Sequence, residues 1–215
     1  MKYKNILFDL DGTITDSSPG IINSYKYSLH KFGLTENDEN IIRTYIGSPL
    51  RAYYSERQKL SHTYSEIAVK FFREHYNETG IYENNVYPGL YELISELYDS
   101  GCRLYIATSK PEKFALTVLD HFKLDKFFSY IKGSDMSPDN KPKSEIIRHV
   151  IETNRLTKPE CIMVGDRYHD IRGAKENGIR SAAVTYGYGS ASELKNEFPD
   201  HIVSDAAGLR EVLLK

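Results

Sequence analysis

The stretch ILFDLDGTITDS, residues 6–17, leads an apolar run directly into two carboxylates. A run this short, stopped by Asp-Gly, predicts a buried β-strand over residues 3–9 rather than a helix. Asp9 and Asp11 are two positions apart, so in an extended chain their side chains point to the same side. Two carboxylates in one place repel each other unless water solvates them, they cap a helix, or they share a cation.

Short apolar runs alternate with helical patterns from about residue 85 onward. Strands are expected over residues 102–107, 127–132, 161–164 and 181–185 and near residue 202, with helices over residues 90–97, 114–122, 144–153 and 171–177 and from about residue 206. This alternation is typical of a parallel sheet with helices on both faces. We therefore predict an α/β fold with a Rossmann-like parallel sheet as its core.

The segment between the first strand and residue 85 has a different pattern. Apolar residues recur at helical spacing from Ile21 to Phe32, and the helix-like, Tyr-rich sequence continues to about Thr79 without one convincing buried strand. We predict that residues 16–84 form a helical cap domain, inserted into a core made of residues 1–15 and 85–215.

The composition excludes several classes of function. Among 215 residues, 28 are Lys or Arg and 30 are Asp or Glu, which gives a net charge of -2. Nucleic acid and anionic membranes are therefore not expected as partners. Cys102 and Cys161 lie beside apolar runs without metal-ligand spacing, and we expect both to be reduced core residues. The apolar start of the chain is too short for a signal peptide or a membrane anchor, which favours a cytoplasmic protein.

Ligands of a parallel sheet bind where the strands end, at their carboxyl edge. The residues at those places are Asp9 and Asp11 after the first strand, Thr108, Ser109 and Lys110 after the second, Ser134 and Asp135 after the third, and Gly165 and Asp166 after the fourth. Most of these groups suit a phosphate or a metal ion. The predicted sheet thus brings chemically useful side chains to one edge.

A shared cation best explains the paired carboxylates. A calcium-binding loop starting at Asp9 would need glycine at its sixth place, where the sequence has Ile14. The segment GDRYHD supplies Asp166 and Asp170 at another strand end, and together with Asp9 and Asp11 they offer an oxygen site suited to Mg²⁺.

Hydroxyls and lysines near this edge can bind a phosphoryl group. Thr108 and Ser109 either donate hydrogen bonds to phosphoryl oxygens or cap the helix that starts near Pro111, whose positive end points the same way. Lys141 and Lys143 flank a proline just before a helix. Either can reach the site, and one of the two is expected to be surface charge.

Four segments in this order resemble the motifs of the haloacid dehalogenase superfamily. They are DLDGT after the first strand, ATSK after the second, NKPKSEII at a helix start, and VGDRYHDIRGA after the fourth strand. The helical insertion is similar to the small helical cap of that superfamily. The segment TYGYGS, residues 185–190, resembles the subgroup of phosphoglycolate phosphatases and related nucleotidases.

The resemblance implies a role for each matching residue. Asp9 would attack phosphorus to give an aspartyl-phosphate, and Asp11 would protonate the leaving alcohol and then take a proton from water. Mg²⁺ would be held by Asp9, the Asp11 carbonyl and Asp166, with Asp170 in support. The phosphoryl oxygens would be bound by Thr108 and by one lysine, for which Lys143 is favoured over Lys141. Substrate-binding roles are expected for Gly12, Ser109 and Arg51, the last from a loop of the cap.

The resulting prediction is an enzyme, a Mg²⁺-dependent phosphatase of small phosphate monoesters such as phosphoglycolate, a nucleotide or a sugar phosphate. Asp11 favours phosphate esters over haloacids, because a leaving halide needs no proton. A phosphosugar mutase of the same fold remains open, as does a non-catalytic phospho-accepting signalling or binding domain. The sequence is compatible with a monomer or a homodimer.

Overall fold

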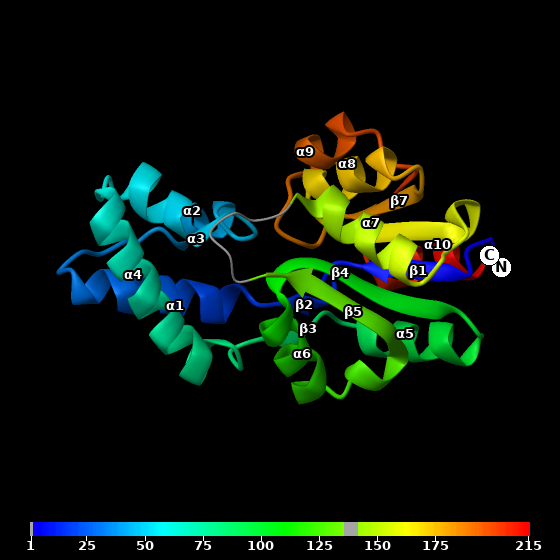
Figure 1. Ribbon diagram of the computed structural model, residues 1–215, viewed down its shortest axis with the longest axis horizontal. Coiled ribbons are helices and arrows are strands. Elements are labelled where there is room, and N and C mark those ends of the chain that lie inside the picture. Colours follow the sequence, from blue (N-terminus) through cyan, green and yellow to red (C-terminus); the bar gives the residue numbers. More distant parts are fainter. Residues whose placement is uncertain (1, 136–141) are drawn as a thin grey trace. The chain divides into compact units, whose positions relative to one another are not determined.

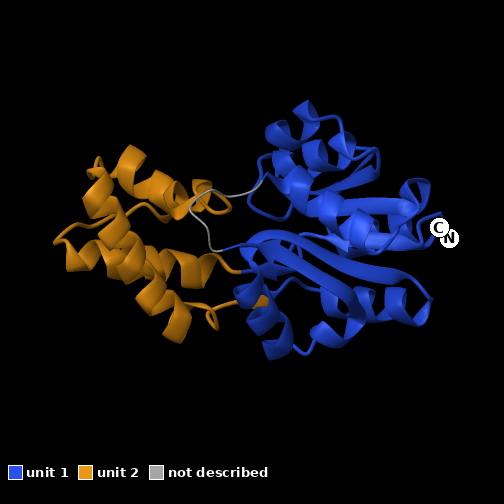
Figure 2. Ribbon diagram, viewed as in Figure 1, with its two compact units in different colours: residues 1–16, 86–215 blue, residues 17–85 orange. Residues whose placement is uncertain are grey.

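The computed structural model describes residues 2–135 and 142–215, and the chain divides into two compact units. The first unit combines Met1–Asp16 with Val86–Lys215, and the second is the continuous segment Ser17–Asn85 (Figure 2). Within the described residues, no helix is long and apolar enough to cross a membrane.

The first unit is built on a six-stranded sheet in the order β5-β4-β1-β6-β7-β8. Every pair of neighbouring strands is parallel. The strands are β1 (Asn5–Phe8), β4 (Arg103–Pro111), β5 (Phe128–Ser134), β6 (Cys161–Gly165), β7 (Arg180–Val184) and β8 (His201–Val203). All four residues of β1 are buried, as expected for a central strand that is covered on both faces.

Helices cover both faces of this sheet (Figure 1). They are α5 (Leu90–Asp99), α6 (Glu112–His121), α7 (Lys143–Thr153), α8 (Tyr168–Glu176), α9 (Ala191–Asn196) and α10 (Ala206–Leu214). In Figure 1, α5 and α6 lie on one side of the sheet and α7 and α8 on the other. The predicted α/β class with a parallel core is confirmed.

Two details of the first unit differ from the sequence-based expectation. The strand expected to end at Ala107 continues to Pro111, so the polar residues of ATSK lie within β4 rather than after it. A register shift against β5 between Ala107 and Pro111 lets this polar segment stay extended. Helix α9 was not expected, because its six residues are too few for a helical period; Ser190 caps it by accepting a hydrogen bond from the Glu193 N–H.

Two very short strands lie at the limits of the first unit. Strands β2 (Thr15–Asp16) and β3 (Asn85–Val86) pair as a separate two-stranded ribbon. The Tyr87 N–H also donates to the Ile14 carbonyl. The two segments through which the chain leaves and re-enters the first unit are therefore hydrogen-bonded to each other.

The second unit is helical. Its elements are α1 (Ser18–Lys31), α2 (Glu39–Thr44), α3 (Leu50–Ala52), α4 (His62–His75) and the π-helical turns η1 (Tyr53–Arg57) and η2 (Tyr76–Gly80). Its core is aromatic: the Tyr25 ring lies 4.5 Å from Tyr53 and 4.7 Å from Phe72, measured between ring centroids. Side-chain oxygens of Asp38 and Ser61 cap α2 and α4, which fixes where these helices begin.

We predict that Ile147→Ala destabilises the protein by about 2–5 kcal/mol, because Ile147 is fully buried between α7 and the sheet and its truncation leaves a cavity. Urea unfolding measures the change. Ile202→Ala is the control, since Ile202 is 43% exposed on β8 and its truncation should cost less than about 0.5 kcal/mol. Equal losses from both substitutions would contradict the description of this core.

Candidate active site

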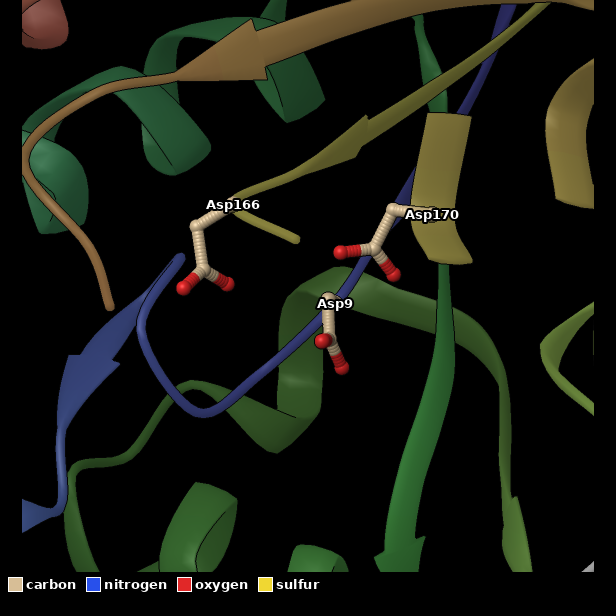
Figure 3. A group of neighbouring side chains, drawn as sticks. All are labelled: Asp9, Asp166 and Asp170. Atoms are coloured by element: carbon tan, nitrogen blue, oxygen red, sulfur yellow. The ribbon is translucent and has the colours of Figure 1, made fainter. Parts of the chain in front are cut away.

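Three carboxylates converge at the carboxyl edge of the sheet. Asp9 follows β1, Asp166 follows β6 and Asp170 lies in the first turn of α8 (Figure 3). Each offers an oxygen within 4.8 Å of the others, and all three residues are buried. The parallel pairing of β1 with β6 brings the first two together, since the Asp9 N–H donates to the Val164 carbonyl at 2.9 Å.

Lys143, the first residue of α7, completes this cluster. Its Nζ lies 2.9 Å from Asp9 Oδ1 and 2.9 Å from Asp170 Oδ1, and the residue is buried. The structure therefore places one of the two candidate lysines in direct contact with the predicted nucleophile. The other, Lys141, lies outside the described residues.

The surroundings of Asp9 favour its charged form. Burial by itself raises the pKa of Asp9, but the charge of Lys143 and hydrogen bonds from Lys143, Thr108 and the Leu10 N–H hold that pKa below its usual value. Burial by itself lowers the pKa of Lys143. The negative charges of Asp170 and Asp9 outweigh this effect, so the pKa of Lys143 is raised. At neutral pH the pair is a carboxylate and an ammonium.

Asp166 is the least compensated member of the cluster. Burial, followed by the charges of Asp170 and Asp9, raises its pKa to about 8. Hydrogen bonds from the Tyr188 N–H and the Thr13 hydroxyl, 2.8 Å and 3.0 Å long, act against this shift without reversing it. The site thus has more negative charge than its own lysine offsets.

This donor set fits a divalent cation. Oxygen ligands from several carboxylates, buried together with excess negative charge, are what Mg²⁺ prefers in proteins. Asp170 is already engaged on both oxygens, Oδ1 with Lys143 and Oδ2 with the Arg167 N–H. It is therefore suited to support a metal ligand, whereas Asp9 and Asp166 are suited to be ligands.

A loop between β7 and α9 encloses Asp166 and contains the segment TYGYGS. A Cβ on Gly189 would lie 2.0 Å from the Asp166 carbonyl oxygen, closer than any side chain can approach backbone. The Tyr186 hydroxyl donates to the Thr13 carbonyl and the Tyr188 hydroxyl donates to Asp16. In the sequence this segment indicates only the subgroup, whereas in the structure it forms a wall of the site.

Gly12 has a similar steric role on the other side of Asp166. Its φ of +84° is in the left-handed region, and a Cβ there would lie 2.3 Å from Asp166 Oδ2. The tight turn after Asp11 therefore depends on glycine. The expected substrate-binding role of Gly12 stays a prediction.

Thr108 and Ser109 lie on β4, next to β1. Thr108 is buried beside Asp9, and its Oγ1 accepts from the Lys110 N–H at 3.2 Å. The Ser109 carbonyl accepts from the Ser134 hydroxyl at 2.7 Å, which ties β4 to β5. Thr108 is thus part of the cluster around Asp9, and Ser109 follows it on the same edge.

Lys110 is a site residue to which the sequence analysis gave no role. Its Nζ contacts both carboxylate oxygens of Asp11, at 3.0 Å and 2.9 Å. The signal was present in the sequence, because Lys110 is the last residue of ATSK. A lysine at a strand end is usually solvated, however, and only the packing of β4 beside β1 shows this one to be buried.

Arg51 belongs to the helical unit and forms an ion pair there with Glu66. This pairing is internal to Ser17–Asn85 and joins α3 to α4. The predicted substrate contact of Arg51 stays a prediction.

Comparisons with known proteins identify the family of the chain. The family model described as haloacid dehalogenase-like hydrolase matches residues 6–184. A 5'-nucleotidase of Pseudomonas aeruginosa is 40% identical over 99% of this chain and 96% of its own length. A phosphoglycolate phosphatase of Vibrio cholerae is 32% identical over 98% and 97%, respectively. The crystal structure of a predicted phosphatase from Clostridium acetobutylicum superposes with a TM-score of 0.91 at 38% identity, covering 100% of this chain and 99% of the other.

The chain belongs to the haloacid dehalogenase-like hydrolase family, and it is an enzyme of the phosphatase class within that family. The resemblance inferred from the four motifs is confirmed.

We predict that Gly189→Ala weakens divalent-cation binding and destabilises the protein by about 1–3 kcal/mol, because the added methyl group forces the loop away from Asp166. Calorimetric titration with Mg²⁺ and thermal unfolding measure the two effects. Gly208→Ala, where the nearest atom would be 3.4 Å from the new methyl, is the matched control. Cation affinity unchanged in Gly189→Ala would show that the loop does not shape the Asp166 site.

Proposed function

We propose that the protein hydrolyses small phosphate monoesters with Mg²⁺, through an aspartyl-phosphate on Asp9. The observation that carries the proposal is the environment of Asp9, a buried carboxylate kept charged by Lys143 and surrounded by acids that suit a metal ion. A carboxyl group attacks phosphorus in its anionic form, and that charge must be offset before a phosphate dianion can approach.

Asp9, Asp166 and the Asp11 carbonyl would hold Mg²⁺, with Asp170 in support. When bound, the cation offsets the charge of the phosphoryl oxygens during transfer. Lys143 would supply a second positive charge beside Asp9. The Thr108 hydroxyl and Ser109, on the neighbouring strand β4, would bind phosphoryl oxygens. Gly12 lets the chain turn close beside the nucleophile.

The reaction has two steps, transfer of the phosphoryl group to Asp9 and hydrolysis of the resulting aspartyl-phosphate. An Asp9 oxygen forms a bond to phosphorus as the ester P–O bond breaks, and Asp11 gives its proton to the leaving alkoxide. Water then attacks the aspartyl-phosphate, Asp11 takes a proton from that water, and inorganic phosphate leaves with Asp9 restored. Asp11 is therefore acid in the first step and base in the second.

The relatives support a small-molecule substrate. Their names assign a nucleotide to one and phosphoglycolate to another, and this chain matches both over nearly their full length. We propose a nucleoside monophosphate, phosphoglycolate or a sugar phosphate as the ester, with the helical unit, including Arg51, selecting among them. A transfer to a second sugar hydroxyl instead of water would be visible as an isomeric phosphosugar without phosphate release.

We predict that Asp9→Asn lowers phosphate release by at least about 10³-fold, because an amide oxygen is a poor nucleophile toward phosphorus. The assay measures phosphate from p-nitrophenyl phosphate and from a panel of nucleoside monophosphates, sugar phosphates and phosphoglycolate, with Mg²⁺ and with a chelator. Asp99→Asn, an exposed acid at the end of α5, is the control and should keep full activity. Activity that survives the chelator or the Asp9 substitution would overturn the proposed mechanism.

We also predict that Mg²⁺ affinity rises with pH up to about 8. Below that pH the Asp166 carboxyl holds a proton that the cation must displace, so the apparent affinity should increase about tenfold per pH unit and then level off. Titration calorimetry in buffers of different ionisation heat measures both the affinity and the single proton released. An affinity that is constant between pH 6 and 8 would contradict this account.

A further inference from the structure

The side chain of Lys110 is buried against Asp11. Nζ contacts both Asp11 oxygens, at 3.0 Å and 2.9 Å, and the exposed fractions of the two side chains are 4% and 18%. A lysine loses much solvation when it is buried, so a buried ion pair is weak evidence for stability by itself. Its position beside a site residue points to a role in fixing geometry.

The site has two buried lysines, and each contacts a different carboxylate of the DLD segment. Lys143 of α7 lies against Asp9, and Lys110 of β4 lies against Asp11. Lys143 also pairs with Asp170, and Lys110 contacts both oxygens of Asp11. A contact that one Nζ makes with both oxygens keeps that carboxylate directed toward Lys110.

The backbone of Lys110 joins the same arrangement. Its N–H donates to Thr108 Oγ1 at 3.2 Å, and the Thr108 side chain in turn lies beside Asp9. Parallel pairing of β4 with β1 keeps the two strand ends side by side. Lys110 therefore links Thr108, which lies beside the nucleophile Asp9, with Asp11, the carboxylate that donates and accepts the proton.

We propose that Lys110 is a positioning residue that holds the Asp11 carboxylate in the orientation needed for proton transfer. The inference rests on the proposed function, in which Asp11 protonates the leaving alkoxide and later accepts a proton from water. A proton is transferred only when its donor or acceptor lies within hydrogen-bond distance and correctly aimed, so loss of Lys110 should impair steps that need Asp11 and spare those that do not.

The leaving group separates these steps. An alkyl phosphate needs a proton on its departing oxygen, whereas p-nitrophenolate leaves without one. Because kcat/KM reports the steps up to formation of the aspartyl-phosphate, Lys110→Met should lower kcat/KM for an alkyl phosphate by about 10²-fold and that for p-nitrophenyl phosphate by less than about threefold. Hydrolysis of the intermediate still needs Asp11, so kcat and KM for the aryl ester should fall together, with a burst of p-nitrophenolate.

Three further variants make the test specific. Lys110→Arg keeps the charge and should recover part of the alkyl-ester rate. Asp11→Asn should show the same division between the two esters, and adding Lys110→Met to it should cost less than about threefold more, since both substitutions remove one function. Lys4→Met breaks an exposed ion pair with Glu160 and should leave both esters unaffected.

The outcomes separate the inference from the function on which it rests. Equal losses of kcat/KM for the two esters would show that Lys110 binds the phosphoryl group, and losses that add in the double variant would show an independent role; either result overturns the proposal. Unchanged alkyl-ester kinetics in folded Lys110→Met would also overturn it. If Lys110→Met does not fold, Lys110→Gln is measured in the same way. Absence of phosphate release by the wild type from every ester would instead overturn the proposed function.

Discussion

The electrostatic repulsion among buried carboxylates is the constraint on which the site depends. Asp9, Asp166 and Asp170 lie within reach of one ion, and Lys143 compensates only part of their charge. Burial, followed by the charges of Asp170 and Asp9, raises the pKa of Asp166 to about 8, so this carboxyl resists ionisation at neutral pH. We expect a fold that keeps such a cluster buried to favour the binding of a divalent cation, because the cation would offset a repulsion already present in the protein.

Close packing of backbone makes that cluster possible. Gly12 and Gly189 approach Asp166 from two sides, at distances that leave no space for a side chain. Bulky residues would open the site to water and weaken every electrostatic interaction within it. The hydrogen bonds of Tyr186 and Tyr188 hold the same loop against the segment that follows the first strand. Segments more than 150 residues apart in the chain thus form one wall, as the Tyr186 to Thr13 and Thr13 to Asp166 contacts illustrate.

The α/β class and parallel sheet could be predicted because the strands are short apolar runs, and the buried strand β1 is the clearest of them. The end of β4 could not be predicted, because its polar residues lie at a register shift between the pairs that Ala107 and Pro111 form with β5. Helix α9 was missed because a six-residue helix is set by its Ser190 cap and its contacts rather than by periodicity. Local sequence predicts an element well where the element buries its own apolar surface. It predicts an element poorly where contacts with a neighbouring element determine the structure.

The sequence by itself determined that Asp9 and Asp11 stand at a strand end and that Asp166, Asp170 and two lysines follow at other element ends. Strand alternation and the carboxyl-edge rule are local properties, so they needed no coordinates. The tertiary structure decided which lysine contacts which carboxylate, pairing Lys143 with Asp9 and Lys110 with Asp11. The reason is physical: a lysine side chain is long and flexible, and its partner is fixed by the packing of neighbouring elements rather than by its position in the chain.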